Sequence, residues 1–184
     1  MCIRDSSGGL PFRGVQDITF MQQFQIESAK TRTLPWRGFT LDLIKAFNLL
    51  PRRVLYHLLI HHGAPPASVK FWFLNLSKLT RRLQVRQAIG PAITMTTGVP
   101  EGDSLSVCAM LVTSSAFYWT LSTPTVFPYA YADNWSYLTT NQRDNIRAFR
   151  KIQDLVHAFR VQIDYAKSWA WGCLLYTSPS PRDA

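Results

Sequence analysis

Two aspartates stand inside segments that are otherwise apolar. Asp42 ends the run Gly38–Leu41, and Asp133 follows the run Tyr129–Ala132. Burying a carboxylate is costly unless it is paired or binds a metal. Magnesium prefers such oxygen ligands, and a pair of metals can stabilise both the attacking and the leaving oxygen of a phosphoryl displacement. Neither aspartate establishes this chemistry alone, since Asp42 equally fits the start of a turn.

The residues around the aspartates form blocks with a fixed order. The blocks are Phe39–Asn48, in which Phe47 follows Asp42 by five positions, then Gly98–Ser106, Tyr131–Asn134 and Phe159–Trp169. In this order they resemble four palm motifs of reverse transcriptases, the RNA-directed DNA polymerases. The second motif of that family is usually Gly-x-Pro-Gln-Gly-x-x-Leu-Ser, and the third is Tyr-x-Asp-Asp.

The resemblance implies a metal site and a reaction. Asp42 and Asp133 would ligate two Mg²⁺ ions, with the Leu43 carbonyl and Asn134 assisting. A DNA primer's 3′ hydroxyl would attack the α-phosphate of a deoxynucleoside triphosphate on an RNA template, and pyrophosphate would leave. Lys167 would lie near the triphosphate and act as a catalytic proton donor. Without the resemblance, Lys167 reads as a solvated surface charge.

Further residues would contact the nucleotide and the template. Phe47 would be a steric gate that leaves no room for a 2′ hydroxyl, and its alternative reading is an ordinary core phenylalanine. The residues of the second block would shape a loop at the template, where glycine allows close backbone approach; they are Gly98, Pro100, Glu101 and Gly102. Residues 9–29 resemble more weakly the fingers of non-LTR retrotransposon enzymes, with Arg13 as a triphosphate contact.

Two positions depart from the family pattern. Asn134 stands where reverse transcriptases carry a second aspartate, so it offers an oxygen ligand without a charge. Glu101 replaces the usual glutamine and adds a charge beside the template loop. Two alternatives therefore stay open. The chain could be a non-catalytic, nucleic-acid-binding relic, or an RNA-templated RNA polymerase, against which Phe47 argues.

The surrounding pattern predicts an α+β fold of the polymerase right-hand palm type, an antiparallel sheet with helices packed on one face, plus partial fingers. The central strands of the sheet are expected to meet in a hairpin around Asp133. The helices expected are 17–29, 51–63, a helix opened by Pro66, 104–119 and 141–159; the strands expected are 38–43, 81–87, 127–132, 136–139 and 161–163.

The two ends of the chain read as one short DNA sequence translated on opposite strands. Back-translating residues 1–6 and taking the reverse complement gives codons for Cys-Leu-Leu-Tyr-Thr, the peptide at residues 173–177. We therefore expect adapter-derived tails at 1–6 and 173–184, partial fingers at 7–36 and palm at 37–172. Trimming these tails leaves Cys108, which argues against a disulfide framework and a Cys-rich zinc site.

The composition fits a nucleic-acid partner. The chain has 184 residues and a formal net charge of +9, and the tails carry equal numbers of basic and acidic residues. Such a balance favours binding to phosphates, although a basic protein without that partner would look the same. No apolar run reaches the roughly 18 residues of a membrane span, so no membrane partner is expected. The enzyme would work inside the cell, in the nucleus or the cytoplasm, and the sequence names no protein partner.

Overall fold

The computed structural model describes residues 14–173. The helices are α1 (Val15–Thr31), α2 (Ala46–Leu49), α3 (Arg52–His61), α4 (Pro66–Ser77), α5 (Ser104–Leu121) and α6 (Gln142–Phe159). The strands are β1 (Trp36–Asp42), β2 (Thr80–Val85), β3 (Ala88–Thr94), β4 (Val126–Tyr131), β5 (Asn134–Thr139) and β6 (Trp169–Cys173).

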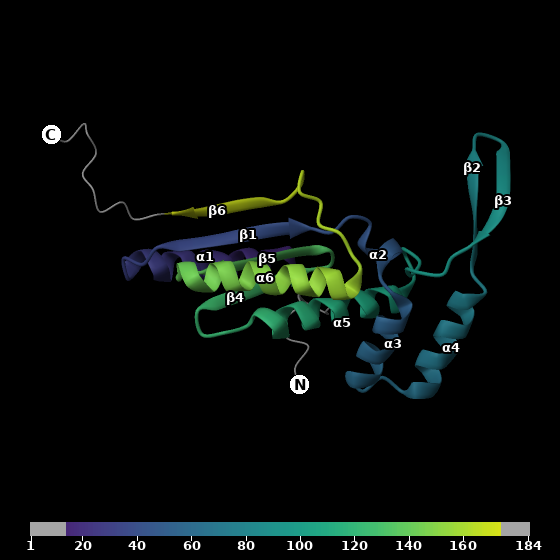
Figure 1. Ribbon diagram of the computed structural model, residues 1–184, viewed down its shortest axis with the longest axis horizontal. Coiled ribbons are helices and arrows are strands. Elements are labelled where there is room, and N and C mark those ends of the chain that lie inside the picture. Colours follow the sequence, from purple (N-terminus) through teal and green to yellow (C-terminus); the bar gives the residue numbers. More distant parts are fainter. Residues whose placement is uncertain (1–13, 174–184) are drawn as a thin grey trace.

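An antiparallel sheet with the strand order β4-β5-β1-β6 forms the centre of the molecule (Figure 1). β4 and β5 form the expected hairpin, in which Tyr131 pairs with Asn134 across the two-residue turn Ala132-Asp133. Ala132 takes the left-handed conformation at φ 51°, as tight hairpin turns require. The sequence-based expectation of an α+β fold with an antiparallel sheet is confirmed.

One face of this sheet holds the main core. Because side chains alternate along a strand, Leu41 of β1 lies beside its register partner Trp135 of β5 on this face, and both are buried. Trp135 stacks on Phe117 of α5 at 4.6 Å between ring centroids, and Phe39 contacts Phe149 of α6 at 5.2 Å. The two long helices α5 and α6 therefore cover the face that carries the odd-numbered residues of β1.

The opposite face is covered in part by α1, from the segment expected to be fingers. Gln22 on α1 donates a 2.7 Å hydrogen bond to the hydroxyl of Ser136, whose register partner on β1 is Thr40. The even-numbered residues of β1, which include Asp42, point to this second face. Helices of the palm thus lie on one face, as expected, while α1 crosses the other.

α5 is long and apolar enough, by length and composition alone, to cross a membrane. In this fold it is the central core helix. Its side chains Ala109, Met110, Phe117 and Leu121 are buried against the sheet and its neighbouring helices. Burial of 44% of its residues within the protein accounts for part of its apolar composition.

Two strands differ from the sequence-based expectation. The segment 161–163 makes only one bridge, Leu43 to Ile163, and the sheet edge is instead β6, whose residues are mostly exposed. β6 ends at Cys173 opposite Trp36, one residue into the segment expected to be adapter-derived. A solvent-exposed edge strand shows no apolar alternation, so the pattern did not reveal it. The origin of the tails and the domain boundaries stay predictions.

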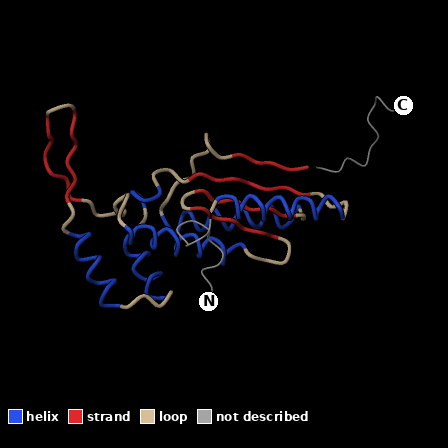
Figure 2. The backbone as a smooth tube through the Cα atoms, turned by 180° about the vertical axis from the view of Figure 1, so that it is seen from behind, coloured by secondary structure: helices blue, strands red, loops and turns tan. Residues whose placement is uncertain are grey.

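Between β1 and α5 the chain leaves the sheet. α3 packs on α5 and on α4, and β2 pairs with β3 in a separate hairpin that stands apart from the central sheet (Figure 2). Only the first of these two strands was expected. The second, β3, contains Gly90 and Pro91, residues that are rare in strands and that hid it.

The chain returns from this excursion through Gly98, which lies against the backbone of Asn48. A Cβ atom at Gly98 would lie 2.3 Å from the Asn48 carbonyl oxygen, and its φ is +74°. Gly63, at the end of α3, has a similar φ of +84° with no atom within 4 Å of such a Cβ. Gly98 and Gly63 therefore have similar backbone conformations, but only Gly98 has other atoms packed closely against it.

Replacing Ile152 tests the docking of α6. Ile152 is 0% exposed and Ile146, on the same helix, is 48% exposed. We expect Ile152→Ala to lower the free energy of unfolding by about 2–5 kcal/mol and Ile146→Ala to change it by at most about 0.5 kcal/mol. Urea unfolding of both variants measures this difference, and equal losses would show that α6 does not bury the face described here.

Alanine substitutions at Gly63 and Gly98 separate the energetic cost of a left-handed backbone from the cost of a steric overlap. Gly63→Ala should cost about 1–2 kcal/mol of unfolding free energy through its left-handed backbone alone. Gly98→Ala adds the overlap with Asn48, so we expect roughly 3 kcal/mol or more. Thermal and urea denaturation of the two variants give the comparison. A Gly98→Ala variant as stable as Gly63→Ala would contradict this packing.

Candidate functional site

The register of β1 with β5 brings the candidate metal ligands to one end of the sheet. Asp42 is the register partner of Asn134, and Asp133 lies in the turn that precedes Asn134. Directly opposed residues of antiparallel strands have Cβ atoms about 4.5–5.5 Å apart. Asp133 is half-buried and Asn134 exposed, while the Asp42 side chain is 18% exposed. Two carboxylates and an amide therefore share one sheet end.

A short turn after α6 holds Asp42 through its backbone. The Asp42 N–H donates to the hydroxyl of Ser168 at 3.1 Å, and the Asp42 carbonyl accepts from the N–H of Asp164 at 2.8 Å. The Ser168 hydroxyl in turn donates to the Asp164 carbonyl at 2.7 Å. Sequence reasoning singled out neither Asp164 nor Ser168, because their contacts with Asp42 span more than a hundred residues.

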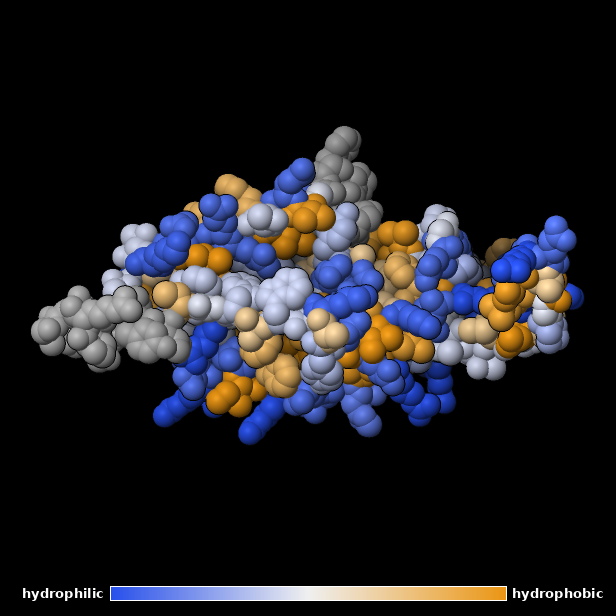
Figure 3. All heavy atoms as spheres, turned by 90° about the horizontal axis from the view of Figure 1, so that it is seen from above, coloured by the Kyte–Doolittle hydropathy of each residue, from blue (hydrophilic) through white to orange (hydrophobic). Residues whose placement is uncertain are grey.

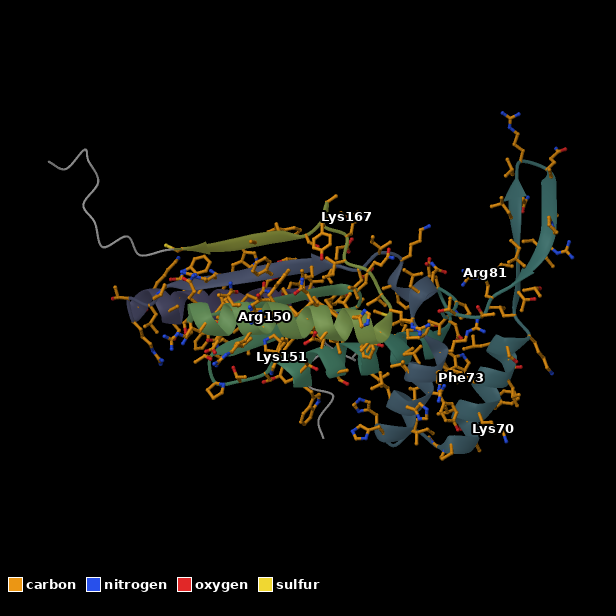
Figure 4. The ribbon with its side chains drawn as sticks, in the orientation of Figure 1. Lys70, Phe73, Arg81, Arg150, Lys151 and Lys167 are labelled. Carbon is orange, nitrogen blue, oxygen red and sulfur yellow. The ribbon has the colours of Figure 1, made fainter. Side chains whose placement is uncertain are left out.

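The same turn places Lys167 at the Asp42 carboxylate. The ammonium lies 3.5 Å from Asp42 Oδ2 and 3.6 Å from Asp164 Oδ2 (Figure 4). The negative charge of Asp42, and secondly that of Asp164, raises the pKa of Lys167 above its usual range. Lys167 is largely exposed, so the pair is screened by solvent. Lys167 therefore lies beside the candidate metal ligand Asp42 and is not simply a solvated surface lysine.

The donor set suits magnesium more than zinc. No cluster of three or more His, Cys, Asp or Glu residues that could hold a metal occurs within residues 14–173. Mg²⁺ keeps several waters and is often bound through one or two carboxylates together with substrate phosphates. Asp42, Asp133 and the amide oxygen of Asn134 fit that pattern. Leu43 is buried and forms the bridge to Ile163, and the part of its carbonyl in metal binding stays a prediction.

The second motif packs on the chain that follows Asp42. The Val99 N–H donates to the Phe47 carbonyl at 2.7 Å, and the Gly98 N–H donates to the Leu50 carbonyl at 2.8 Å. Phe47 lies on the short helix α2, half-buried against the core. The structure thus joins the Phe47 segment directly to the loop that begins at Gly98.

A polar network around Asn48 includes Glu101. The Asn48 amide donates to Glu101 Oε1 at 2.8 Å, and Arg81 donates to Asn48 Oδ1 at 2.5 Å. Glu101 thus accepts a hydrogen bond and is linked through Asn48 to a cation. Sequence reasoning noticed neither role, because Arg81 comes from the β2–β3 hairpin, far away in the chain.

The remaining contacts fix the loop at both ends. Arg52 donates to the Gly98 carbonyl at 2.8 Å and to the Leu76 carbonyl at 2.8 Å, so it ties the loop to α3 and α4. Asp103 caps α5 by accepting from the Leu105 N–H at 3.1 Å, and it also accepts from the Trp72 indole at 2.9 Å. Arg52, Asp103 and Trp72 are therefore positioning residues of this loop.

The sequence-predicted residues thus fall into two groups. The first, at the sheet end, holds the expected ligands with Leu43 and the lysine; its members are Asp42, Leu43, Asp133, Asn134 and Lys167. The second, at the start of α5, contains Phe47, Gly98, Pro100, Glu101 and Gly102. The segment from Leu43 to Ala46 connects them directly. Arg13 lies outside the described residues.

A cavity adjoins the first group. It has a volume of about 270 Å³ and lies between α1 and the second sheet face, lined among others by Gln22, Thr40, Tyr131, Asn134 and Trp169. Tyr129 also lines it, and the Tyr129 hydroxyl is buried without a hydrogen-bond partner. Burial raises the pKa of the Tyr129 phenol far above its usual range.

Solved structures with a similar fold are telomerases of two Candida species. Telomerase from Candida tropicalis in complex with a TWJ fragment of telomeric RNA gives a TM-score of 0.72 at 12% identity over 95% of this chain. Apo telomerase from the same species, truncated from its C-terminal domain, gives 0.65 at 13% identity over 95%. Telomerase from Candida albicans with the same kind of RNA fragment gives 0.60 at 12% identity over 97%.

The likeness is one of fold. This chain spans about a third of the telomerase chains, covering 31%, 37% and 32% of them respectively. No protein-family model and no curated protein matches the sequence. At these identities, the likeness shows only that this chain shares the mixed α and β fold of part of these telomerase chains.

Proposed function

We propose that this chain is the palm and partial fingers of an RNA-directed DNA polymerase from a retrotransposon, using two Mg²⁺ ions and deoxynucleoside triphosphates. The observation that carries the proposal is the register that sets Asp42 opposite Asn134, with Asp133 in the adjoining turn. Two acidic strand ends on a polymerase-like sheet are the arrangement that two-metal nucleotidyl transfer needs.

Each residue group has a task in this reaction. Asp42 and Asp133, with Asn134 and the Leu43 carbonyl, would hold the metals, which when bound supply charge stabilisation for the phosphoryl displacement. Phe47 and the loop at Gly98, Pro100, Glu101 and Gly102 would contact the incoming nucleotide and the template. The hydrogen bond from the Val99 N–H to the Phe47 carbonyl keeps these two contacts in one unit.

Lys167 has two successive roles in the proposal. Its ammonium lies on the Asp42 carboxylate that the metal would use. A divalent cation held by Asp42 would repel this ammonium, so Lys167 would turn away from Asp42 and towards the triphosphate. There it would donate a proton to the leaving pyrophosphate.

The fold relatives support the nucleic-acid partner. Two of the Candida telomerases named above were solved with a fragment of telomeric RNA, and this chain has a net charge of +9. The assignment to retrotransposons, and to an RNA template with a DNA primer, rests on the motif blocks.

Primer extension tests the catalytic assignment in the protein completed through its full reading frame. We expect Asp42→Ala to lower the extension rate at least roughly hundredfold, since the metals supply several kcal/mol of transition-state stabilisation. Asn134→Asp should keep or raise the rate by adding a charged ligand. Asp154→Ala, at an exposed aspartate of α6, is the matched control.

The same measurements also distinguish an active polymerase from a non-catalytic relic of one. An Asp42→Ala enzyme with full activity would end the metal assignment. A completed wild-type protein that is inactive, and stays so with Asn134→Asp, would favour the relic. We expect the 184-residue chain alone to give no processive extension, because it spans only about a third of the similar polymerases.

Metal binding by the 184-residue chain tests the role of Lys167 without catalysis. Removing the competing ammonium by Lys167→Met should tighten Mn²⁺ binding by roughly a few-fold at most, because solvent screens this exposed ion pair. Lys70→Met removes an equal charge from α4 and should leave the affinity unchanged. Electron paramagnetic resonance of free Mn²⁺ gives both affinities, with Asp42→Asn as the variant expected not to bind. Equal affinities for Lys167→Met and wild type would show no competition.

A further inference from the structure

The outer ridge of α6 is strongly basic. Arg143, Arg147 and Arg150 recur at spacings of four and three residues, so they share one side of the helix, opposite the buried Ile152. All three are exposed. In Figure 3, hydrophilic side chains project along the lower edge, the side on which Figure 1 places α6 in front of the sheet. We call these three residues the arginine ridge.

The arginine ridge works against the stability of its own helix. Arg143 lies in the first turn of α6, where the helix dipole is positive and cations are unfavourable. Like charges four residues apart, as at Arg143 and Arg147, also repel each other. The only acidic residue among the first ten of α6 is Asp144, which lies 3.5 Å from Arg147 and accepts a hydrogen bond from Thr125. Helix formation therefore does not account for this charge pattern, whereas an anionic partner would.

The adjoining helix α5 carries an exposed aromatic near its end. Lys151, the neighbour of Arg150 (Figure 4), donates a 2.8 Å hydrogen bond to the carbonyl of Thr120 at the end of α5. The preceding residue, Trp119, is 60% exposed. Cations that follow a phosphate backbone, beside an aromatic ring on which a base can stack, are the two components of single-strand binding surfaces.

We propose that the arginine ridge, Lys151 and Trp119 form a binding surface for single-stranded nucleic acid. The ridge contacts the phosphates, and Trp119 stacks on a base. α5 and α6 cover the sheet face opposite to Asp42 and Asn134, so this surface is separate from the candidate catalytic site. A strand bound here would lie on the back of the palm while the template occupies the front.

Binding of a fluorescent, unstructured oligouridylate to the 184-residue chain tests this surface. Anisotropy titrations over a range of salt concentrations give the affinity and its salt slope. The triple change Arg143→Gln, Arg147→Gln and Arg150→Gln should reduce that slope by about 2, since each single-strand phosphate contact contributes about 0.7. Trp119→Ala should weaken binding about tenfold through loss of stacking. Circular dichroism should show α6 retained in both variants.

A charge-matched control separates a local site from net charge. Lys30→Gln, Lys70→Gln and Lys78→Gln remove three exposed cations elsewhere and should leave most of the slope intact. Photo-crosslinking with 4-thiouridine RNA should give adducts at Trp119 and residues 143–151. The proposal is overturned if the control reduces the slope equally, or if all adducts map to the opposite sheet face. It also fails if the arginine variant loses binding to anionic lipid vesicles but not to RNA.

Discussion

The antiparallel register of β1 with β5 is the constraint on which the rest of the candidate site depends. It sets Asp42 opposite Asn134 and leaves Asp133 in the turn at the same sheet end. A slip of one residue would exchange the two faces of β1, and Asp42 would then point into the core that Leu41 now occupies. The alternation of the buried, apolar Leu41 with the partly exposed Asp42 therefore specifies the position of the carboxylates as well as the stability of the sheet.

The buried face supplies that specification through large aromatic side chains. Trp135, stacked on Phe117, can occupy only the face against α5. Phe39 contacts both Tyr137 and Phe149, so it can likewise occupy only the face against α6. Because these contacts lie close to the hairpin, the rigid core reaches nearly to the candidate ligands. The exposed end of the hairpin can then carry polar residues without loss of register.

The sequence predicted the features that depend on local patterns. Helices α5 and α6 follow from their patterns of apolar residues, and the β4–β5 hairpin follows from its turn. Features set by contacts distant in sequence were missed. The strand β6 is an exposed edge, and Asp164 and Ser168 hold Asp42 across more than a hundred residues. A single sequence carries no signal for such pairs.

Glu101 shows how the missed contacts change the reading of a departure from the family pattern. Taken alone, it is an extra negative charge at a template loop. In the structure it accepts a hydrogen bond from Asn48, which also accepts one from Arg81, so it belongs to a polar network from three segments. The glutamine usual at this position can accept the same bond from Asn48, so the network requires the acceptor oxygen and not the charge. The change from glutamine to glutamate therefore keeps the contact that positions this side chain.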